Sequence, residues 1–336
     1  MDVVVGLDNG GNANKPTVLD ARGRFLVDEL LEMPSRVLEG PGVAVEALAH
    51  AFANVLEMTG VTPSAVRGVG LDTPGPASAD GVISSKGSTN FSMPAWRGFD
   101  IRGALEARLG LPVVYSNDGN AAALYAHHVH FGADAPRRSS VSVVVGTGLG
   151  GGLVESGRVV RGAAGMAGEL GHVIIPLDGI LEADQSLPAC NCGNVGDAES
   201  IASLSAIERN LLPYWLTRYP DHELAGLEAA AAAKLVRGHA EKGDALGRAI
   251  FAQQAMALGR LFTLVSNVTD PDAYFIGGGV VETTPELRKW FVDLTTQHTN
   301  LREEQLRVAS FAEVPDLDMA GARGAALAAW DQLRHA

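Results

Sequence analysis

The pair Asn117-Asp118 is the part of the sequence best suited to catalysis. It follows a short apolar segment, residues 112–115, that predicts a strand, and it precedes a predicted helix that begins near Gly119. A carboxylate at such a junction can accept the proton that leaves a hydroxyl group when its oxygen attacks phosphorus. Asn117 carries both a donor and an acceptor and suits the binding of a neighbouring hydroxyl. Both residue types also cap helices, so capping is an alternative interpretation of the pair.

Three glycine clusters stand at the ends of apolar segments that predict strands. They are Asp8-x-Gly10-Gly11, Gly146-Thr147-Gly148-x-Gly150 and Gly277-Gly278-Gly279. Backbone amides with no side chain in the way are suited to polyphosphate binding, although each glycine could also be an ordinary turn residue. Asp8 could orient the hydration shell of Mg²⁺, because this ion keeps several waters and takes one or two carboxylates.

Strands and helices alternate along the chain, which predicts an α/β fold with a parallel or mixed sheet. The expected strands cover residues 3–7, 17–19, 66–71, 112–115, 141–145, 153–155 and 274–276, and the expected helices 45–59, 101–109, 244–268 and 321–330. A strand, a glycine cluster and a returning strand occur near Asp8 and again near Gly146, so two copies of one hairpin are expected to hold a nucleotide. His127, His128 and His130 are expected on a helix surface, because successive helical positions point in different directions.

Composition and charge limit the classes of function. The 336 residues are 46% hydrophobic and carry a formal net charge of −13. This composition argues against extensive disorder, and the acidic charge argues against nucleic-acid and membrane partners. The chain begins without a basic segment and has no run of about 18 apolar residues, so a cytoplasmic protein is expected. Cys190 and Cys192 are too close in sequence for an unstrained mutual disulfide, so they would act as thiolates.

The sequence resembles the ROK family of bacterial sugar kinases and repressors, within the actin-like, hexokinase-type ATPase superfamily. The resemblance covers nearly the whole chain and rests on five motifs in order. These are Asp8-x-Gly-Gly, Asn117-Asp118-x-Asn120-Ala-Ala, Gly146-Thr-Gly-x-Gly-Gly-Gly, Gly168-Glu-Leu-Gly-His172 followed by Cys190-x-Cys-Gly, and Ile276-Gly-Gly-Gly. It implies two actin-like (ribonuclease H-like) α/β domains with an interdomain cleft. The expected domains are residues 1–116 with 317–336, and residues 117–316.

The resemblance also implies roles for single residues. Asp118 would be the general base, and the sugar would be bound by Asn117, Asp118, Glu169, His172, Glu199 and Asn90. ATP, with Mg²⁺, would be bound by Asp8, Gly10, Gly11, Asn12, Gly146, Thr147, Gly148, Gly150, Gly278 and Gly279. Asn12 stands where the family usually has Thr, so the phosphate contacts of this first loop are less secure than those at Thr147.

This sequence departs from the family in the residues expected to bind a structural Zn²⁺. The family holds zinc with one His and three Cys, and here the matching positions are His172, Cys190, Cys192 and Asp197, within a loop of residues 172–199. A carboxylate oxygen can replace the third thiolate in a tetrahedral site, at a cost in affinity. The alternative is a metal-free loop with two thiols.

The activity that the resemblance implies is phosphorylation of a hexose by ATP, with glucose, converted to glucose 6-phosphate, as the expected substrate. N-acetylmannosamine, N-acetylglucosamine, fructose or allose is the alternative acceptor, and polyphosphate the alternative donor. A catalytically lapsed sugar-binding protein is a further alternative, suggested by Asn12 and Asp197. The family's repressors carry an N-terminal helix-turn-helix, whereas only seven residues precede Asp8 here, so an enzyme is expected. Family members form dimers and tetramers, which predicts a homo-oligomer.

Overall fold

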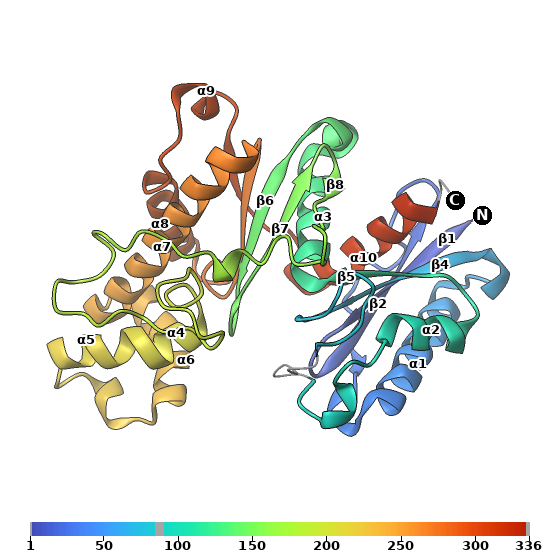
Figure 1. The fold of residues 1–336 in the computed structure, drawn as a ribbon, viewed down its shortest axis with the longest axis horizontal. Helices are drawn as coiled ribbons and strands as arrows, with labels where there is room; N and C mark the ends of the chain where they lie inside the picture. Colours follow the sequence, from blue (N-terminus) through green and yellow to red (C-terminus); the bar gives the residue numbers. More distant parts are fainter. Residues whose placement is uncertain (1, 85–90, 334–336) are drawn as a thin grey trace. The chain divides into compact units, whose positions relative to one another are not determined.

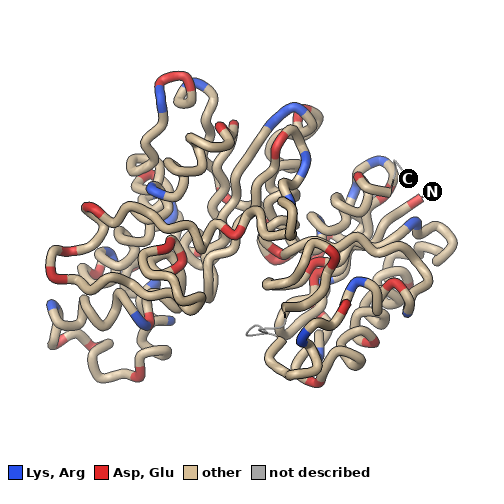
Figure 2. The backbone as a smooth tube through the Cα atoms, in the orientation of Figure 1, with Lys and Arg blue, Asp and Glu red and all other residues tan. Residues whose placement is uncertain are grey.

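The computed structural model describes residues 2–84 and 91–333, and these residues form two compact units. The first unit comprises residues 1–135, 152–168 and 315–336, and the second comprises residues 136–151 and 169–314. Asn90, an expected sugar-binding residue, lies outside the described residues. Within the described ranges, no helix is both long enough and apolar enough to cross a membrane. Residues of both charge signs are scattered along each unit (Figure 2).

The first unit is built on a five-stranded mixed sheet of order β3-β2-β1-β4-β5. Its strands are β1 (Val3–Asn9), β2 (Ala13–Asp20), β3 (Met33–Pro34), β4 (Val66–Thr73) and β5 (Val113–Asn117). β1 runs antiparallel to β2 and parallel to β4, and β4 runs parallel to β5. Helices α1 (Pro41–Thr59) and α2 (Ile101–Leu109) cover one face, and α3 (Asp118–Phe131) and α10 (Leu317–Leu333) lie on the other side of the sheet (Figure 1). Side chains such as Leu7, Leu48 and Leu71 fill the core without solvent exposure.

The second sheet repeats the strand order of the first. It has the order β10-β9-β6-β7-β8, with β6 (Ser140–Val145), β7 (Leu149–Glu155), β8 (Arg158–Val159), β9 (Ala273–Gly278) and β10 (Ser310–Glu313). In each sheet, therefore, the second and fourth strands in chain order flank the first. The helices of the second unit are α4 (Leu204–Ala206), α5 (Leu212–Arg218), α6 (Ala229–Glu241), α7 (Ala245–Thr269), α8 (Pro285–Gln297) and α9 (Glu303–Leu306). The hairpin repeat seen in the sequence is thus part of a repeat of the whole sheet.

The division into units differs from the boundaries expected at residues 116 and 317. Residues 117–135 and 152–168 belong to the first unit. Residues 117–135 belong to the first unit because α3 packs closely on α10. A Cβ atom on Gly324 of α10 would lie 1.8 Å from the carbonyl oxygen of Ala121 of α3. Only glycine permits this approach of two helix backbones.

The expectation for His127 was wrong. This side chain is 1% exposed, and its Nε2 lies 2.9 Å from the carbonyl oxygen of Ala135, whereas His130 is exposed as expected. A buried histidine satisfied by a backbone carbonyl has a structural role.

Candidate functional site

Asn117 and Asp118 stand where β5 passes into α3. Asn117 is the N-cap residue: its Oδ1 accepts a hydrogen bond of 2.9 Å from the amide of Gly119, and Asp118 Oδ1 accepts one of 2.7 Å from the same amide. The capping interpretation is therefore confirmed for Asn117. Asp118 is nevertheless exposed at the start of the helix, so capping leaves its carboxylate accessible to a substrate hydroxyl.

Three neighbouring parallel strands have an aspartate within one residue of their carboxyl ends. In the sheet register, Asp8 of β1 pairs with Asp72 of β4, and Thr73 pairs with Asn117, which precedes Asp118. The carboxyl ends of parallel strands meet at one edge of a sheet, where ligands of open α/β sheets bind. A Cβ atom on Gly321 of α10 would lie 3.1 Å from Asp8 Oδ2 and 3.2 Å from Asp72 Oδ2. One oxygen of each carboxylate therefore lies beside Gly321, and the two carboxylates are neighbours.

Asp72 is a residue that the sequence motifs did not single out. Its side chain is 0% exposed, and in the carboxylate form neither of its oxygens accepts a hydrogen bond from the described residues. A signal was present, because Asp72 directly follows the apolar segment 66–71 as Asp8 directly follows the segment 3–7. Two facing carboxylates, of which Asp72 has both oxygens unpaired, fit a divalent cation, since oxygen ligands suit Mg²⁺.

The electrostatics of this edge follow from burial and from like charge. Burial raises the pKa of Asp8 to about 6, although Lys15, its register partner on β2, opposes the rise. Burial raises the pKa of Asp72 well above its ordinary value, and the charges of Asp8 and Asp118 raise it further. A protonated Asp72 can donate a hydrogen bond to Asp8, which lowers the pKa of Asp8. The edge therefore favours a proton or a cation between these carboxyl groups.

The first glycine cluster forms the turn between β1 and β2. The amide of Gly10 donates to the carbonyl oxygen of Ala13 at 2.9 Å, and the amide of Ser35 donates to that of Asn12 at 3.0 Å. Gly11 is partly exposed and Asn12 is exposed. The turn is thus fixed by backbone bonds while its tip remains accessible.

The second and third glycine clusters lie together in the second unit. Residues 146–148, called the glycine tip below, connect β6 to β7, while Gly150 lies within β7. Gly278 has a φ of +88°, and a Cβ atom there would lie 2.2 Å from the carbonyl oxygen of Val145, so the position requires glycine. The amide of Gly279 donates to the same oxygen at 2.9 Å.

These two clusters line one cavity of about 290 Å³. Its walls include Gly146, Thr147 and Gly279 together with the apolar side chains of Leu204, Ile207, Phe251 and Val280. Two basic side chains of α6, Lys234 and Arg237, also line the cavity. The sequence motifs did not predict these two residues as part of the site. The volume is close to the lower end of small-molecule sites, and the combination of an apolar wall, backbone amides and cations suits a nucleotide.

The expected sugar-binding residues of the second unit interact with one another. Burial raises the pKa of the half-buried Glu169, and Glu199 adds to the rise while His172 opposes it. Glu199 Oε2 accepts a 2.9 Å hydrogen bond from the amide of Leu149, directly after the glycine tip. The structure thus places Glu169, His172 and Glu199 in one electrostatic group.

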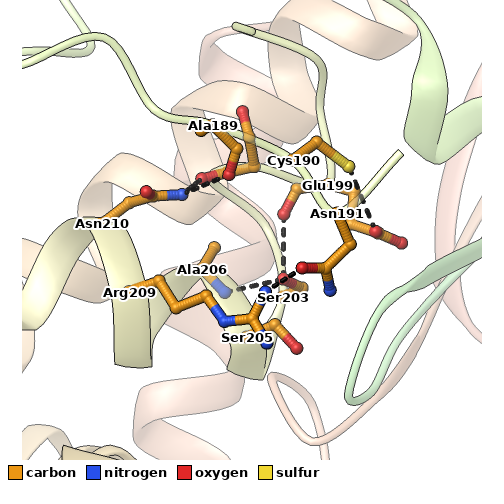
Figure 3. Close-up of a pocket in the computed structure, with 10 residues that line it drawn as sticks. Ala189, Cys190, Asn191, Glu199, Ser203, Ser205, Ala206, Arg209 and Asn210 are labelled. Atoms are coloured by element: carbon orange, nitrogen blue, oxygen red, sulfur yellow. Dashed lines mark hydrogen bonds between the residues drawn. The ribbon is translucent and has the colours of Figure 1, made fainter. Parts of the chain in front are cut away.

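The four expected zinc ligands converge. Their ligand atoms all lie within 4.8 Å of one another. Asp197 Oδ2 lies 3.4 Å from His172 Nδ1 and 3.3 Å from Cys192 Sγ, and Cys190 Sγ lies 3.8 Å from His172 Nδ1. A zinc tetrahedron with bonds of about 2.0–2.3 Å has edges of about 3.3–3.8 Å. Burial raises the pKa of the Cys190 thiol, and this thiol donates to Glu199 Oε1 at 3.4 Å (Figure 3).

The repeated sheets and their acidic and glycine-rich strand ends define the class of protein: an α/β protein with the actin-like ATPase fold. The model of the ROK family matches residues 4–332. A glucokinase of Halalkalibacterium halodurans is 31% identical over 293 residues, which cover 85% of this chain and 82% of the glucokinase.

Two solved structures extend the comparison. The ROK hexokinase of Thermus thermophilus has a TM-score of 0.77 and 30% identity, with 99% of this chain and 100% of the hexokinase covered. A ROK family glucokinase of Streptomyces griseus, in complex with glucose and AMPPNP, has a TM-score of 0.69 and 27% identity over 99% of this chain and 100% of the glucokinase. The chain belongs to the ROK family and is a sugar kinase.

Proposed function

We propose that the protein transfers a phosphoryl group from ATP to glucose and forms glucose 6-phosphate, with Asp118 as the general base. The observation that carries this proposal is the position of Asp118, an exposed carboxylate fixed at the start of α3 beside two further strand-end aspartates. Relatives named glucokinase, and a neighbour in complex with glucose and AMPPNP, support this choice of acceptor and donor.

In this proposal Asp118 accepts the proton of the attacking sugar hydroxyl, and Asn117 orients a neighbouring hydroxyl. Glu169, His172 and Glu199 hold the other hydroxyls, because carboxylates and imidazoles accept from donors in fixed directions. The glycine tip, Gly278 and Gly279 receive ATP in the cavity of the second unit. Gly10, Gly11 and Asn12 supply the phosphate contacts of the first unit.

Two metal ions fit the donor sets described above. Asp8 and Asp72 would hold Mg²⁺, because the buried Asp72 carboxylate accepts no hydrogen bond from the described residues. When bound, Mg²⁺ neutralises charge on the phosphates during transfer. His172, Cys190, Cys192 and Asp197 would hold a structural Zn²⁺, since their ligand atoms lie within 4.8 Å of one another and three of the separations match the edges of a zinc tetrahedron.

The test of the proposal is the Asp118→Asn variant, which keeps an acceptor for the Gly119 amide and loses the base. Its kcat should fall about 10²- to 10⁴-fold, the usual contribution of general base catalysis, while the dissociation constant of glucose stays within about threefold of wild type. Asp80→Asn is the matched control, because Asp80 is an exposed aspartate of the same unit and its loss changes the net charge equally. Activity of Asp118→Asn within tenfold of the control would refute the assignment.

A panel of acceptors and donors then tests the substrate. Glucose, mannose, fructose, N-acetylglucosamine, N-acetylmannosamine and allose are compared by kcat/KM with ATP and with polyphosphate. Glucose with ATP should give the highest value, and a higher value for another pair would replace the proposed substrates. Sugar binding without product from any pair would identify a catalytically lapsed protein.

A further inference from the structure

The segment that follows loop 172–199 runs along the glycine tip. The amide of Leu204 donates to the carbonyl oxygen of Gly146 at 2.9 Å, and the amide of Ser205 donates to that of Thr147 at 3.1 Å. At the other end of the tip, Glu199 Oε2 accepts from the amide of Leu149 at 2.9 Å. Both ends of the tip are therefore bonded to the segment 199–205.

The Glu199 carboxylate lies directly against the tip. A Cβ atom on Gly148 would lie 2.6 Å from Glu199 Oε2, so any larger residue at position 148 would displace this carboxylate. Glycine at position 148 therefore leaves room for the Glu199 carboxylate, in addition to leaving the backbone accessible to phosphate.

Glu199 also bonds to both sequence motifs expected to recognise sugar and metal. Its amide donates to the carbonyl oxygen of Gly171 at 2.8 Å, within Gly168-Glu-Leu-Gly-His172. Its other carboxylate oxygen, Oε1, accepts from Cys190 Sγ, and its carbonyl oxygen accepts from Ser203 Oγ at 2.8 Å (Figure 3). One side chain therefore connects the glycine tip to loop 172–199.

The hydrogen bond from the Leu149 amide to the Glu199 carboxylate stabilises the local fold. Leu149 is 6% exposed, and a buried amide without an acceptor is costly, whereas a bond to a carboxylate is stronger than one between neutral groups. The bonded amide belongs to the first residue of β7, so it fixes where the strand begins and how the tip lies over the cavity.

We propose that Glu199 is a positioning residue for the nucleotide: by holding the Leu149 amide, its carboxylate keeps the glycine tip in the conformation that binds a nucleoside phosphate, before any sugar is present. The proposal rests on the proposed function, because it assumes that the cavity of the second unit receives the nucleotide. Loop 172–199 then affects nucleotide affinity as well as sugar recognition.

The experiment measures the dissociation constant of ADP by calorimetry, with Mg²⁺ and without sugar. Glu199→Ala should weaken ADP binding about tenfold, and Glu199→Gln, whose amide oxygen can still accept from Leu149, should stay within about threefold of wild type. Glu182→Gln is the control, because Glu182 is an exposed glutamate of the same loop that does not line the cavity. It should bind ADP as wild type does.

The outcomes separate this proposal from the proposed function. A role in sugar binding alone would raise the KM of glucose in Glu199→Ala and leave the sugar-free ADP constant unchanged, which would overturn the proposal. If Glu199→Ala does not fold, Glu199→Asp takes its place, since its shorter side chain keeps the charge and withdraws the acceptor, and it should lose the same tenfold. Wild-type enzyme that neither binds ADP nor phosphorylates glucose would instead refute the proposed function.

Discussion

Replacing Gly70 by alanine should destabilise the first unit strongly. Gly70 lies in β4 two residues before Asp72, and α10 packs directly on it. A Cβ atom at this position would lie 1.9 Å from the carbonyl oxygen of Ala325 and 2.3 Å from the carbonyl carbon. Because both are backbone atoms, no change of rotamer can relieve the overlap. Gly6 of β1 makes the same kind of contact, with its Cβ position 2.0 Å from the carbonyl oxygen of Ala322.

The size of the effect follows from the displacement required. To restore an ordinary contact of 3.4 Å, the helix and the strand must separate by about 1.5 Å. A gap of only 0.5–1 Å already forfeits about a quarter to a half of each dispersion contact, so a loss of about 3 kcal/mol in the free energy of unfolding is expected. Kinase activity should fall as well, since β4 carries Asp72 at the sheet edge.

The assay is urea unfolding followed by circular dichroism and by tryptophan fluorescence, because two units can unfold in separate transitions. Gly42→Ala is the matched control: Gly42 lies in α1, and a Cβ atom there meets nothing within 4 Å. This control should gain up to about 1 kcal/mol, since alanine favours helix over glycine. If Gly70→Ala unfolds within about 0.5 kcal/mol of wild type, the packing argument is wrong.

Two further predictions concern pH and metal. In metal-free enzyme, the raised pKa of Asp72 means that the folded state binds a proton more tightly than the unfolded state, so this group's contribution to stability falls as pH rises above about 4. Asp72→Asn should therefore gain stability over wild type by more than about 1 kcal/mol between pH 4.5 and pH 7.5 in thermal or urea unfolding, and a constant difference across this range would contradict the assignment. Purified enzyme should contain about one zinc per chain by elemental analysis, and Cys192→Ser should lose most of it and unfold at a lower temperature. Equal zinc content in both proteins would exclude Cys192 as a ligand.

Much of the architecture could be predicted from local sequence. Helix α2 occupies residues 101–109 as expected, and α7 follows the cap Asp244. Periodic apolar residues and Gly or Asp at the ends determine such elements locally. The glycine clusters could be placed at strand ends for the same reason. The start of β7 was predicted four residues too late, because Gly150, Gly151 and Gly152 resemble a turn in the sequence but lie in the strand.

The order of motifs along the sequence determined by itself that this chain is a ROK protein with Asp118 at a strand-to-helix junction. Motifs are local, since each depends on a few consecutive residues. Only the tertiary structure decided that Asp72 faces Asp8, that Lys234 and Arg237 line the cavity, and that Glu199 reaches the amide of Leu149. These contacts join residues far apart in the chain. They depend on sheet register and helix packing, which no single segment of the sequence specifies.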